Sequence, residues 1–509
     1  MTIDQQQAFA ARMTEQRRSR HTTVPHVIAG QKYFEGTLLQ REDPSNPGSV
    51  VSACHDAPTE LVELAVQASR DAQRAWSRVP AEQRIEQVRR AIPFIEERIE
   101  EWAVRVALEI GKPYAGARAE GAEVLEIVRQ YADYASAEGA FEDQREDDPS
   151  GLANESVLRP YGVFGVITPF NYPIVQAAGP AVAALIAGNG VVVKTSHDGP
   201  WSGHAVYELC EAMGLPQGLV NVVHGGDGPG RALVASDIDG ICFTGSVAVG
   251  KSILRDFASG PYPRPVIAEM GGKNPVIVTD TADLELAADG IVFSAFDLSG
   301  QKCSALSRVL VTPSAHDKLV ELVGERVRDL KAGDPVDAGV FAGPVVSAEA
   351  VDRYAGLLAT ARGEEFHVET GKAQDGGYFV PATVVSGVPA THRLATKEHF
   401  LPFLTISKVP TFEAALAEAN NTEMGLTAGI YTGDEGEARE FLDCIEAGCV
   451  DVNVPGHATT GWWPGPQTFG GWKASGTTGK QTLGKWYFQL FGRQQARKLP
   501  AHLQHLLQH

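Results

Sequence analysis

The feature that most constrains this chain is an alternation of short β-rich runs with helix-like segments between residues 162 and 277. The β-rich runs are 162–168, 190–194, 219–224, 240–243 and 276–279. The helix-like segments between them are 174–187, 203–213, 229–235 and 249–256. Such alternation is typical of a parallel sheet covered by helices on both faces. Sheets of this kind bind ligands at the carboxyl ends of their strands.

The remainder of the chain predicts a second unit and simpler flanking parts. A second α/β stretch extends over 269–454, with strand-like segments at 308–312, 403–409 and 428–432. Upstream, apolar residues recur at helical spacing over 61–72 and again over 85–99, which predicts two amphipathic helices. Residues 455–484 are rich in glycine, threonine and tryptophan, which predicts a loop. A chain of 509 residues also exceeds one small domain.

Charge excludes several classes of partner. The chain carries 44 Lys and Arg against 63 Asp and Glu, a formal net charge of −19. Nucleic-acid binding needs clustered cations, and an anionic membrane surface would repel this chain. We therefore expect neither a nucleic acid nor a membrane as partner.

The cysteines and the N-terminus indicate a cytoplasmic protein. The six cysteines are scattered without a CxxC pair, which is unlike a zinc site or a secreted disulfide framework. We expect reduced thiols and no metal. Residues 1–21 lack the apolar segment of a secretory signal. The most apolar stretch, 177–193, is interrupted by glycine, proline and asparagine, so it predicts a buried helix and strand rather than a membrane span.

Two glycine-rich turns are candidates for holding phosphate. Residues 224–231 read HGGDGPGR, which has the glycines of a dinucleotide site without the GxGxxG spacing. Residues 243–246 read FTGS after a predicted strand and before a helix that contains Gly250. That arrangement suits a pyrophosphate at a helix N-terminus. On spacing alone, a tight strand-to-helix turn explains the first segment better than a phosphate site does, and it explains the second equally well.

Seven motifs in order resemble the aldehyde dehydrogenase superfamily. They are ITPFNYP at 167–173, VK at 193–194, FTGS at 243–246, EMGGKNP at 269–275, GQKC at 300–303, ExFxP at 398–402 and FGGxKxSG at 469–476. The resemblance spans roughly residues 29–491. It implies an α/β fold of two Rossmann-like lobes with parallel-rich sheets and a small β arm for oligomerisation. The implied division is 1–139 with 158–268 for dinucleotide binding, 269–481 for catalysis, and 140–157 with 482–509 for the arm and tail.

The resemblance also implies the chemistry. Cys303 matches the nucleophile that attacks the aldehyde carbon and carries the thioester. Asn171 and the Cys303 backbone N–H match the donors to the oxyanion. Glu269 matches the general base that activates water to hydrolyse the thioester. The expected product is a carboxylic acid.

The implied cofactor is NAD or NADP. Lys194 is expected at the adenosine ribose, Gly245 and Ser246 at the pyrophosphate, and Glu398 at the nicotinamide ribose. The other expected contacts are Thr168, Phe170, His197 and Phe400. The family usually has a glutamate where this chain has His197, so the repulsion of a 2′-phosphate is absent. We therefore expect NADP to be tolerated alongside NAD. Leu401 replaces a common glycine next to Phe400.

The motifs are most similar to the branch that oxidises glutamate semialdehyde, the 1-pyrroline-5-carboxylate dehydrogenases. The expected substrate contacts are Ser304, Gly461, Trp462 and Phe469. A tryptophan at 462 departs from the small residue of that branch and reshapes the anchor, and Trp462 and Trp463 instead suit an apolar pocket or a subunit contact. A glutamate-semialdehyde enzyme, a general aldehyde dehydrogenase and a CoA-acylating or acyl-reducing relative all stay open. The family implies a homodimer or homotetramer, paired through 140–157 and 486–493.

Overall fold

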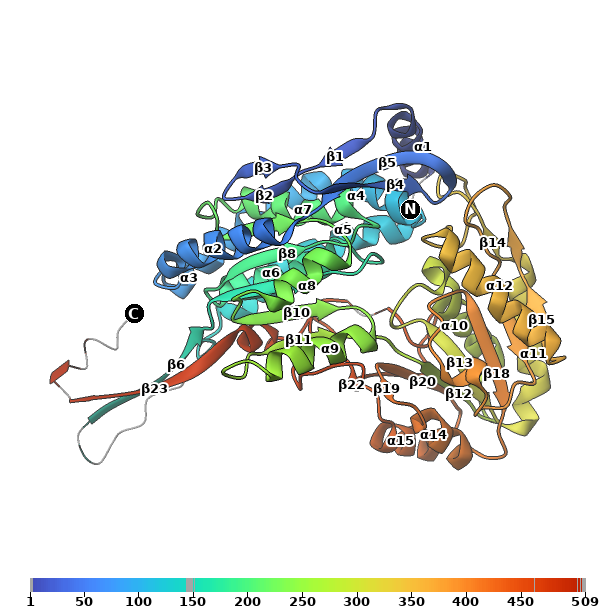
Figure 1. Cartoon of the computed structure of the whole chain (residues 1–509). Helices are drawn as coiled ribbons and strands as arrows, with labels where there is room; N and C mark the ends of the chain where they lie inside the picture. Colours follow the sequence, from blue (N-terminus) through green and yellow to red (C-terminus); the bar gives the residue numbers. More distant parts are fainter. Residues whose placement is uncertain are drawn as a thin grey trace.

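The chain folds into two α/β lobes that face each other, with a β-ribbon extending from one of them (Figure 1). The computed structural model describes residues 3–142, 150, 152–461, 463–500, 502, 503 and 505. Each lobe is built on a seven-stranded sheet. This bears out the predicted α/β class with parallel-rich sheets.

The first sheet has the strand order β11-β10-β7-β8-β9-β2-β3. Its parallel strands are β7 (Val163–Ile167), β8 (Gly190–Lys194), β9 (Val220–Val223), β10 (Gly240–Thr244) and β11 (Val266–Glu269). The antiparallel strands β2 (His26–Ile28) and β3 (Gln31–Tyr33) extend it at one edge. After β9 the chain crosses to the far side of β7 to form β10. The point at which the strand order reverses therefore lies between β7 and β10, where such sheets bind ligands.

Helices cover both faces of this sheet. They are α2 (Thr59–Trp76), α3 (Ala81–Arg89), α4 (Ile92–Ile110), α5 (Tyr114–Ala135), α6 (Val175–Ile186), α7 (Pro200–Ala212), α8 (Asp227–Ala235) and α9 (Val247–Ala258). Every residue of α6 except Gln176 is buried, because this helix lies between the sheet and other helices. This burial accounts for its apolar sequence. Within the described part of the chain, no helix is both long and apolar enough to pass through a bilayer.

The second sheet has the order β15-β17-β18-β13-β12-β20-β21. Its strands are β12 (Asn274–Val278), β13 (Leu306–Val311), β15 (His367–Thr370), β17 (Thr383–Ser386), β18 (Phe403–Lys408), β20 (Thr427–Tyr431) and β21 (Cys449–Val452). The helices beside it are α10 (Leu284–Phe296), α11 (Pro313–Asp329), α12 (Ala348–Gly363), α13 (Arg393–Thr396), α14 (Phe412–Asn420) and α15 (Glu435–Cys444). All its strands are parallel except β15.

One predicted strand belongs to the other lobe. The β-rich run at 276–279 is part of β12 and lies in the second sheet, whereas β11 completes the first sheet. The sequence prediction missed β11 because its four residues, Val-Ile-Ala-Glu, are too few to show a period. The helix predicted over 85–99 is two helices, α3 and α4, and Pro93 lies in the first turn of α4 where a missing N–H costs little.

The N-terminal region carries elements that the sequence did not reveal. Helix α1 (Ile3–Arg18) precedes a three-stranded sheet of β1 (Thr22–Val24), β5 (Asn46–Asp56) and β4 (Thr37–Asp43). Arg17 pairs with Asp43 at 2.7 Å and with Asp334 at 2.8 Å, so it joins this region to the second lobe.

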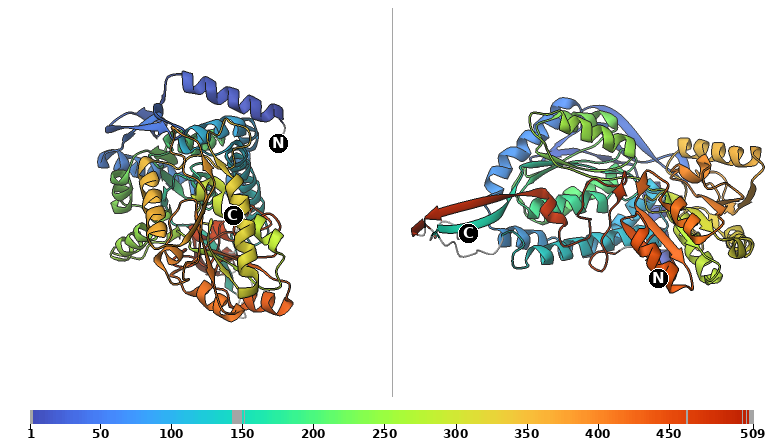
Figure 2. Two further views of the ribbon diagram at one scale, coloured as in Figure 1. Left: turned by 90° about the vertical axis from the view of Figure 1, so that its right-hand side faces the viewer. Right: turned by 90° about the horizontal axis from the view of Figure 1, so that it is seen from below.

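The arm is an antiparallel ribbon of β6 (Leu152–Pro160) and β23 (Gly492–Pro500) that projects away from both lobes (Figure 2). The predicted pairing segments, 140–157 and 486–493, are misplaced. Residues 487–491 form the 3₁₀ turn η2 (Tyr487–Phe491), because Tyr487, Phe488 and Phe491 are buried in the core of the first lobe. Predicted arm residues 143–149 and 151 lie outside the described residues. The domain boundaries drawn from the sequence stay a prediction.

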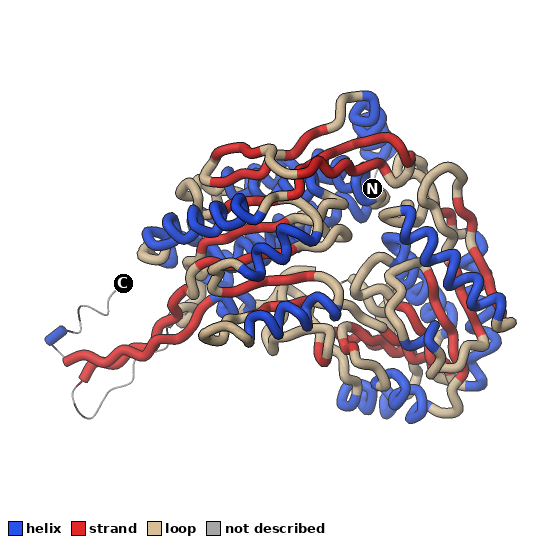
Figure 3. Tube along the Cα trace, in the orientation of Figure 1, coloured by secondary structure: helices blue, strands red, loops and turns tan. Residues whose placement is uncertain are grey.

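The predicted loop at 455–484 is confirmed (Figure 3). In the described part of it, strand structure is limited to the two residues of β22 (Trp472–Lys473). The loop returns to the first lobe, where the Met270 N–H donates to the Ser475 carbonyl oxygen at 2.8 Å. It therefore passes directly beside Glu269.

Candidate active site

Cys303 follows a run of left-handed backbone. Leu298, Ser299 and Gly300, the last three residues of the short helix η1 (Asp297–Gly300), have φ of 52°, 54° and 66°. Such φ values are strained for Leu and Ser. A Cβ at Gly300 would overlap the Leu401 carbonyl oxygen, so this position needs glycine. The Ser299 Oγ donates to the Gly343 carbonyl at 2.6 Å, which helps hold the turn.

The backbone around Cys303 is tied to two other segments. The Asn274 Nδ2 donates to the Cys303 carbonyl oxygen at 2.7 Å and to the Ala305 carbonyl oxygen at 2.9 Å. The Thr459 Oγ1 donates to the Ser304 carbonyl oxygen at 3.0 Å. The turn is therefore fixed from β12 on one side and from the 455–484 loop on the other.

The thiol of Cys303 is partly exposed to a pocket. Burial raises its pKa to about 12, and the negative charges of Glu398 and Glu269 add to the rise. The thiol is accordingly protonated near neutral pH in this arrangement. Attack on a carbonyl carbon needs the thiolate, so a base must remove the proton.

Glu269 ends β11 and faces the same pocket. Burial raises the pKa of this carboxyl to about 8, and the Gly471 backbone N–H opposes that rise. Its Oε2 oxygen has no hydrogen-bond partner among the described residues. A carboxyl group with a pKa near the working pH and a free oxygen is suited to general-base catalysis.

The structure brings most of the predicted catalytic and substrate residues into one pocket. Cys303, Glu269, Ser304, Gly461 and Phe469 all line it, and its volume is about 110 Å³. A pocket of this size suits a small aldehyde.

Asn171 reaches Cys303 through the backbone. Its Nδ2 donates to the Gln301 carbonyl oxygen at 2.9 Å, and its side chain is buried. Asn171 does not itself belong to the described residues that line the pocket. One amide N–H of Asn171 is thus engaged with the turn that carries Cys303.

The tryptophan predictions have different outcomes. Trp462 lies outside the described residues. Trp463 is 39% exposed and does not belong to the described lining of the pocket that holds Cys303, so a role as a substrate wall stays a prediction.

Two charged residues that sequence reasoning missed also line the pocket: Lys302 and Glu123. Burial lowers the pKa of Lys302, but Asp297 and Tyr172 raise it above its ordinary value, so it is cationic. Burial raises the pKa of Glu123 to about 7, with a further rise from Glu120. Lys302 lies in the GQKC motif, directly before Cys303, so the sequence could have indicated that it lies at the site. Glu123 is a half-buried residue of α5, and its sequence context gave no such signal.

The predicted cofactor residues of the first lobe stand at the carboxyl ends of its central strands. Thr168 follows β7, Lys194 ends β8, and Gly245 and Ser246 follow β10. The Thr168 Oγ1 is buried with no partner among the described residues, which leaves a donor for a ligand. Ser246 caps the N-terminus of α9 by accepting from the Val249 N–H. These residues fit a dinucleotide at the reversal of strand order.

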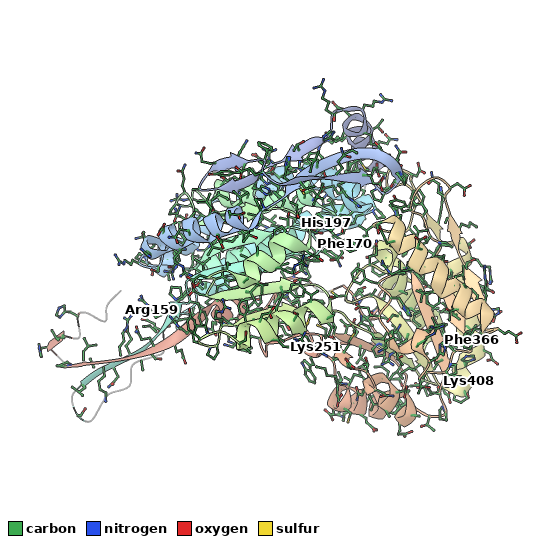
Figure 4. The ribbon with its side chains drawn as sticks, in the orientation of Figure 1. Arg159, Phe170, His197, Lys251, Phe366 and Lys408 are labelled. Carbon is green, nitrogen blue, oxygen red and sulfur yellow. The ribbon has the colours of Figure 1, made fainter. Side chains whose placement is uncertain are left out.

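Lys194 and His197 occupy contrasting positions. Lys194 is buried, and burial lowers its pKa, although Asp227, Cys54 and Asp56 oppose the decrease. His197 has an exposed side chain 3.8 Å from Asp198. Figure 4 places His197 and Phe170 at the edge of the first lobe that faces the second.

The second lobe supplies Glu398 and Phe400. The Gly272 N–H donates to Glu398 Oε1 at 3.1 Å, and a Cβ at Gly271 would overlap Oε2. Phe400, with φ of 57°, meets Phe170 edge-to-face at 5.9 Å between ring centroids. The two lobes therefore meet across these rings. Leu401 points away into an apolar cluster with Val345 and other residues of its own lobe.

Comparison with known proteins agrees with this geometry. The sequence profile of the aldehyde dehydrogenase family matches residues 34–496. The chain belongs to this family. It is an aldehyde dehydrogenase that uses a nicotinamide dinucleotide.

Relatives in this family point to related substrates. A 1-pyrroline-5-carboxylate dehydrogenase of Geobacillus thermodenitrificans is 32% identical over 489 residues, covering 94% of each chain. An alpha-ketoglutaric semialdehyde dehydrogenase of Bacillus subtilis is 32% identical and covers 85% of this chain and 90% of its own. The solved 1-pyrroline-5-carboxylate dehydrogenase from Thermus with bound NAD has a TM-score of 0.91 and 31% identity, covering 97% of this chain and 96% of that one.

Proposed function

We propose that this aldehyde dehydrogenase oxidises a short amino-acid semialdehyde, glutamate semialdehyde first, to the carboxylic acid. The observation that carries the proposal is that Lys302 and Glu123 line the same pocket as Cys303. A cation and a carboxyl group in one small pocket complement a substrate that carries both a carboxylate and an ammonium group. A plain aliphatic aldehyde would offer no charged group to Glu123, which is costly in a partly buried site, whereas Lys302 would keep its ion pair with Asp297.

The catalytic cycle begins with the thiol of Cys303. Glu269, with its free Oε2, removes the thiol proton, and the thiolate bonds to the aldehyde carbon. The carbonyl oxygen gains negative charge, and the Cys303 backbone N–H together with the Asn171 amide stabilises it. Asn171 also holds the turn in place through its bond to Gln301.

Oxidation and hydrolysis complete the cycle. Bound NAD(P)⁺ supplies the acceptor for the hydride that leaves the thiohemiacetal carbon. The carbon then forms a double bond to its oxygen, so a thioester remains on Cys303. Glu269 first releases the thiol proton to solvent. It then takes a proton from water, which attacks the thioester carbon and releases the acid and the Cys303 thiolate.

The chain has groups at both ends of a dinucleotide. Lys194, Gly245 and Ser246 would hold the adenosine ribose and pyrophosphate, while Glu398 and Phe400 would hold the nicotinamide riboside. We propose NAD as the first cofactor, because the negative charges of Asp227 and Asp56 act on Lys194 and disfavour a 2′-phosphate. His197 carries no such repulsion, so NADP is tolerated.

A second candidate substrate is alpha-ketoglutaric semialdehyde, because a Bacillus subtilis relative is named as a dehydrogenase of that compound. It has a carboxylate for Lys302 but no ammonium group for Glu123. The presence of Glu123 in the pocket favours the amino-acid semialdehyde. A CoA-acylating reaction is disfavoured because Glu269 is placed to activate water.

Oligomerisation through the arm is part of the proposal. The ribbon of β6 and β23 extends away from both lobes, which would let it reach another chain. We propose a homodimer or homotetramer built on this ribbon. A solution mass equal to one chain would contradict it.

A substrate panel tests the proposed activity. NADH formation is measured with glutamate semialdehyde, alpha-ketoglutaric semialdehyde and propanal. We expect kcat/KM to be highest for glutamate semialdehyde and lowest for propanal, with at least about a tenfold spread, as expected when buried polar groups lose their partners. Equal kcat/KM for glutamate semialdehyde and propanal would overturn the proposal.

A further inference from the structure

The loop after β21 connects a buried carboxylate to the wall of the pocket. Asp451 lies on β21 and is 4% exposed. Ten residues later, Thr460 and Gly461 line the pocket that holds Cys303. The conformation of this loop therefore determines one wall of the pocket.

His457 stands between these two ends. Its Nδ1 lies 3.2 Å from the Asp451 Oδ2. Its ring also lies against Gly461, where a Cβ would come within 2.8 Å of the ring atoms Cδ2 and Nε2. Gly461 has φ of 106°, a conformation that favours glycine. The histidine ring thus occupies the space beside the pocket wall while its nitrogen bonds to the strand.

The other contacts of the loop hold its backbone before Thr460. The Tyr431 hydroxyl donates to the His457 carbonyl oxygen at 3.0 Å. The Ala458 N–H donates to the Ser294 Oγ at 2.7 Å, and the Thr459 Oγ1 donates to the Ser304 carbonyl oxygen. These contacts would remain after loss of the imidazole. The change would therefore mainly free the backbone at Gly461, which forms part of the pocket wall.

We propose that His457 is a positioning residue, which with Asp451 holds Gly461 in place and sets the affinity for the part of the substrate beyond the aldehyde group. The inference rests on the proposed function in one respect: the substrate must carry a group beyond its aldehyde. The turn at Cys303 is held by Asn274 and Glu269 lies at the end of β11, so we expect the chemical step to change little when the His457 ring is lost.

The test measures kcat and KM separately. His457→Ala is assayed with glutamate semialdehyde and with propanal at saturating NAD, beside His457→Asn, whose amide can donate to Asp451. We expect His457→Ala to raise KM for the semialdehyde about tenfold, as for loss of a buried hydrogen-bonded group, with kcat within about twofold. The KM for propanal stays within about threefold, and the Asn variant recovers most of the affinity.

Controls separate positioning from general damage. His367→Ala removes an exposed histidine of the same lobe, paired with Glu369, and is expected to leave both constants unchanged. A second variant, Gly461→Ala, forces a Cβ against the ring and is expected to raise KM in the same way. This variant keeps the test decisive if His457→Ala does not fold.

The outcomes divide clearly. An unchanged KM in both His457→Ala and Gly461→Ala, or an equal fall of kcat with every aldehyde, overturns the inference. If the unaltered enzyme prefers another aldehyde, the proposed function fails. The inference then stands when KM for that preferred aldehyde rises in the variants, and it falls when that KM does not.

Discussion

The side-chain amide of Asn171 donates a hydrogen bond to the carbonyl oxygen of Gln301 at 2.9 Å, two residues before the nucleophile. This bond joins the turn after β7 in the first lobe to the turn that carries Cys303 in the second. Asn171, the proposed donor to the oxyanion, is thereby positioned by the segment that carries Cys303.

Replacing Asn171 by alanine should slow the chemical step. Removal of one preorganised oxyanion donor typically lowers kcat by about 10²- to 10³-fold. Steady-state kcat with saturating aldehyde and NAD checks this, and a thermal unfolding curve shows whether the lobes still assemble. An Asn171→Ala enzyme with kcat within threefold of the parent, a change worth only about 0.7 kcal/mol, would remove Asn171 from the mechanism.

The thiol of Cys303 should be indispensable. Cys303→Ala should show no NADH formation above background, because no other described thiol both lines the pocket and lies partly exposed. Cys444→Ala is the matched control, since Cys444 is exposed on α15 and far along the chain from the motif. Turnover by Cys303→Ala at the parental rate would dismiss the thioester route.

Activity should rise with pH as Glu269 loses its proton. Burial raises the pKa of this carboxyl to about 8, so the base is largely protonated below that pH. We expect kcat to increase toward about pH 8 and then to level off. In Glu269→Gln both the deprotonation of the Cys303 thiol and the hydrolysis of the thioester should be impaired, so the burst of NADH and the steady-state rate should both fall. A pH profile that is flat between about 6 and 9 in the parent would show that another group acts as base.

The carboxyl group of Glu269 should lower the stability of the fold as pH rises, whereas it raises activity. Its folded pKa lies above the unfolded value of 4.5, so the folded state binds more protons between those values. Stability therefore falls as pH rises through this window and is lowest above about 8. Glu269→Gln removes the penalty, and its Tm should exceed that of the parent at alkaline pH but not at acid pH. Differential scanning calorimetry at both pH values decides the matter.

Much of the first sheet could be predicted from the sequence. The runs at 190–194 and 240–243 match β8 and β10 almost residue for residue, because buried parallel strands are continuously apolar. The strands between Thr22 and Asp56 were missed, since they mix charged and apolar residues without a clear period. The sequence also did not show that β11 and β12 are separate strands. They are short and adjacent in sequence, yet they lie in different sheets.

The site divides in the same way. Cys303, Glu269 and Glu398 could be predicted because each lies in a short sequence motif. Glu123 and Lys302 line one pocket only because the two lobes bring α5 and the turn after η1 together, which no local sequence pattern encodes. Left-handed backbone at Leu298 and Phe400 is likewise invisible in sequence, because neither residue favours it.

Cofactor choice should respond to Asp227. This exposed carboxylate lies in the first turn of α8, and its charge acts on Lys194. We expect NAD to be preferred with kcat/KM for NADP lower by less than a thousandfold, and Asp227→Asn to narrow the gap by about fivefold, since a partly screened charge pair is worth about 1 kcal/mol. Asp237→Asn, an exposed aspartate beyond the other end of α8, serves as control. An NADP efficiency more than a thousandfold below NAD (about 4 kcal/mol) would contradict the role given to His197.

The substrate preference should depend on the two charged residues of the pocket wall. Glu123→Gln keeps the shape of α5 but removes the partner for an ammonium group, so kcat/KM for glutamate semialdehyde should fall about tenfold or more. The same variant should change kcat/KM for alpha-ketoglutaric semialdehyde little, because that substrate has no ammonium group. Lys302→Met should impair both semialdehydes, since each has a carboxylate, and it should spare propanal. If Glu123→Gln instead impaired all three aldehydes equally, Glu123 would act through the fold of the pocket, and the assignment of an amino-acid substrate would lose its support.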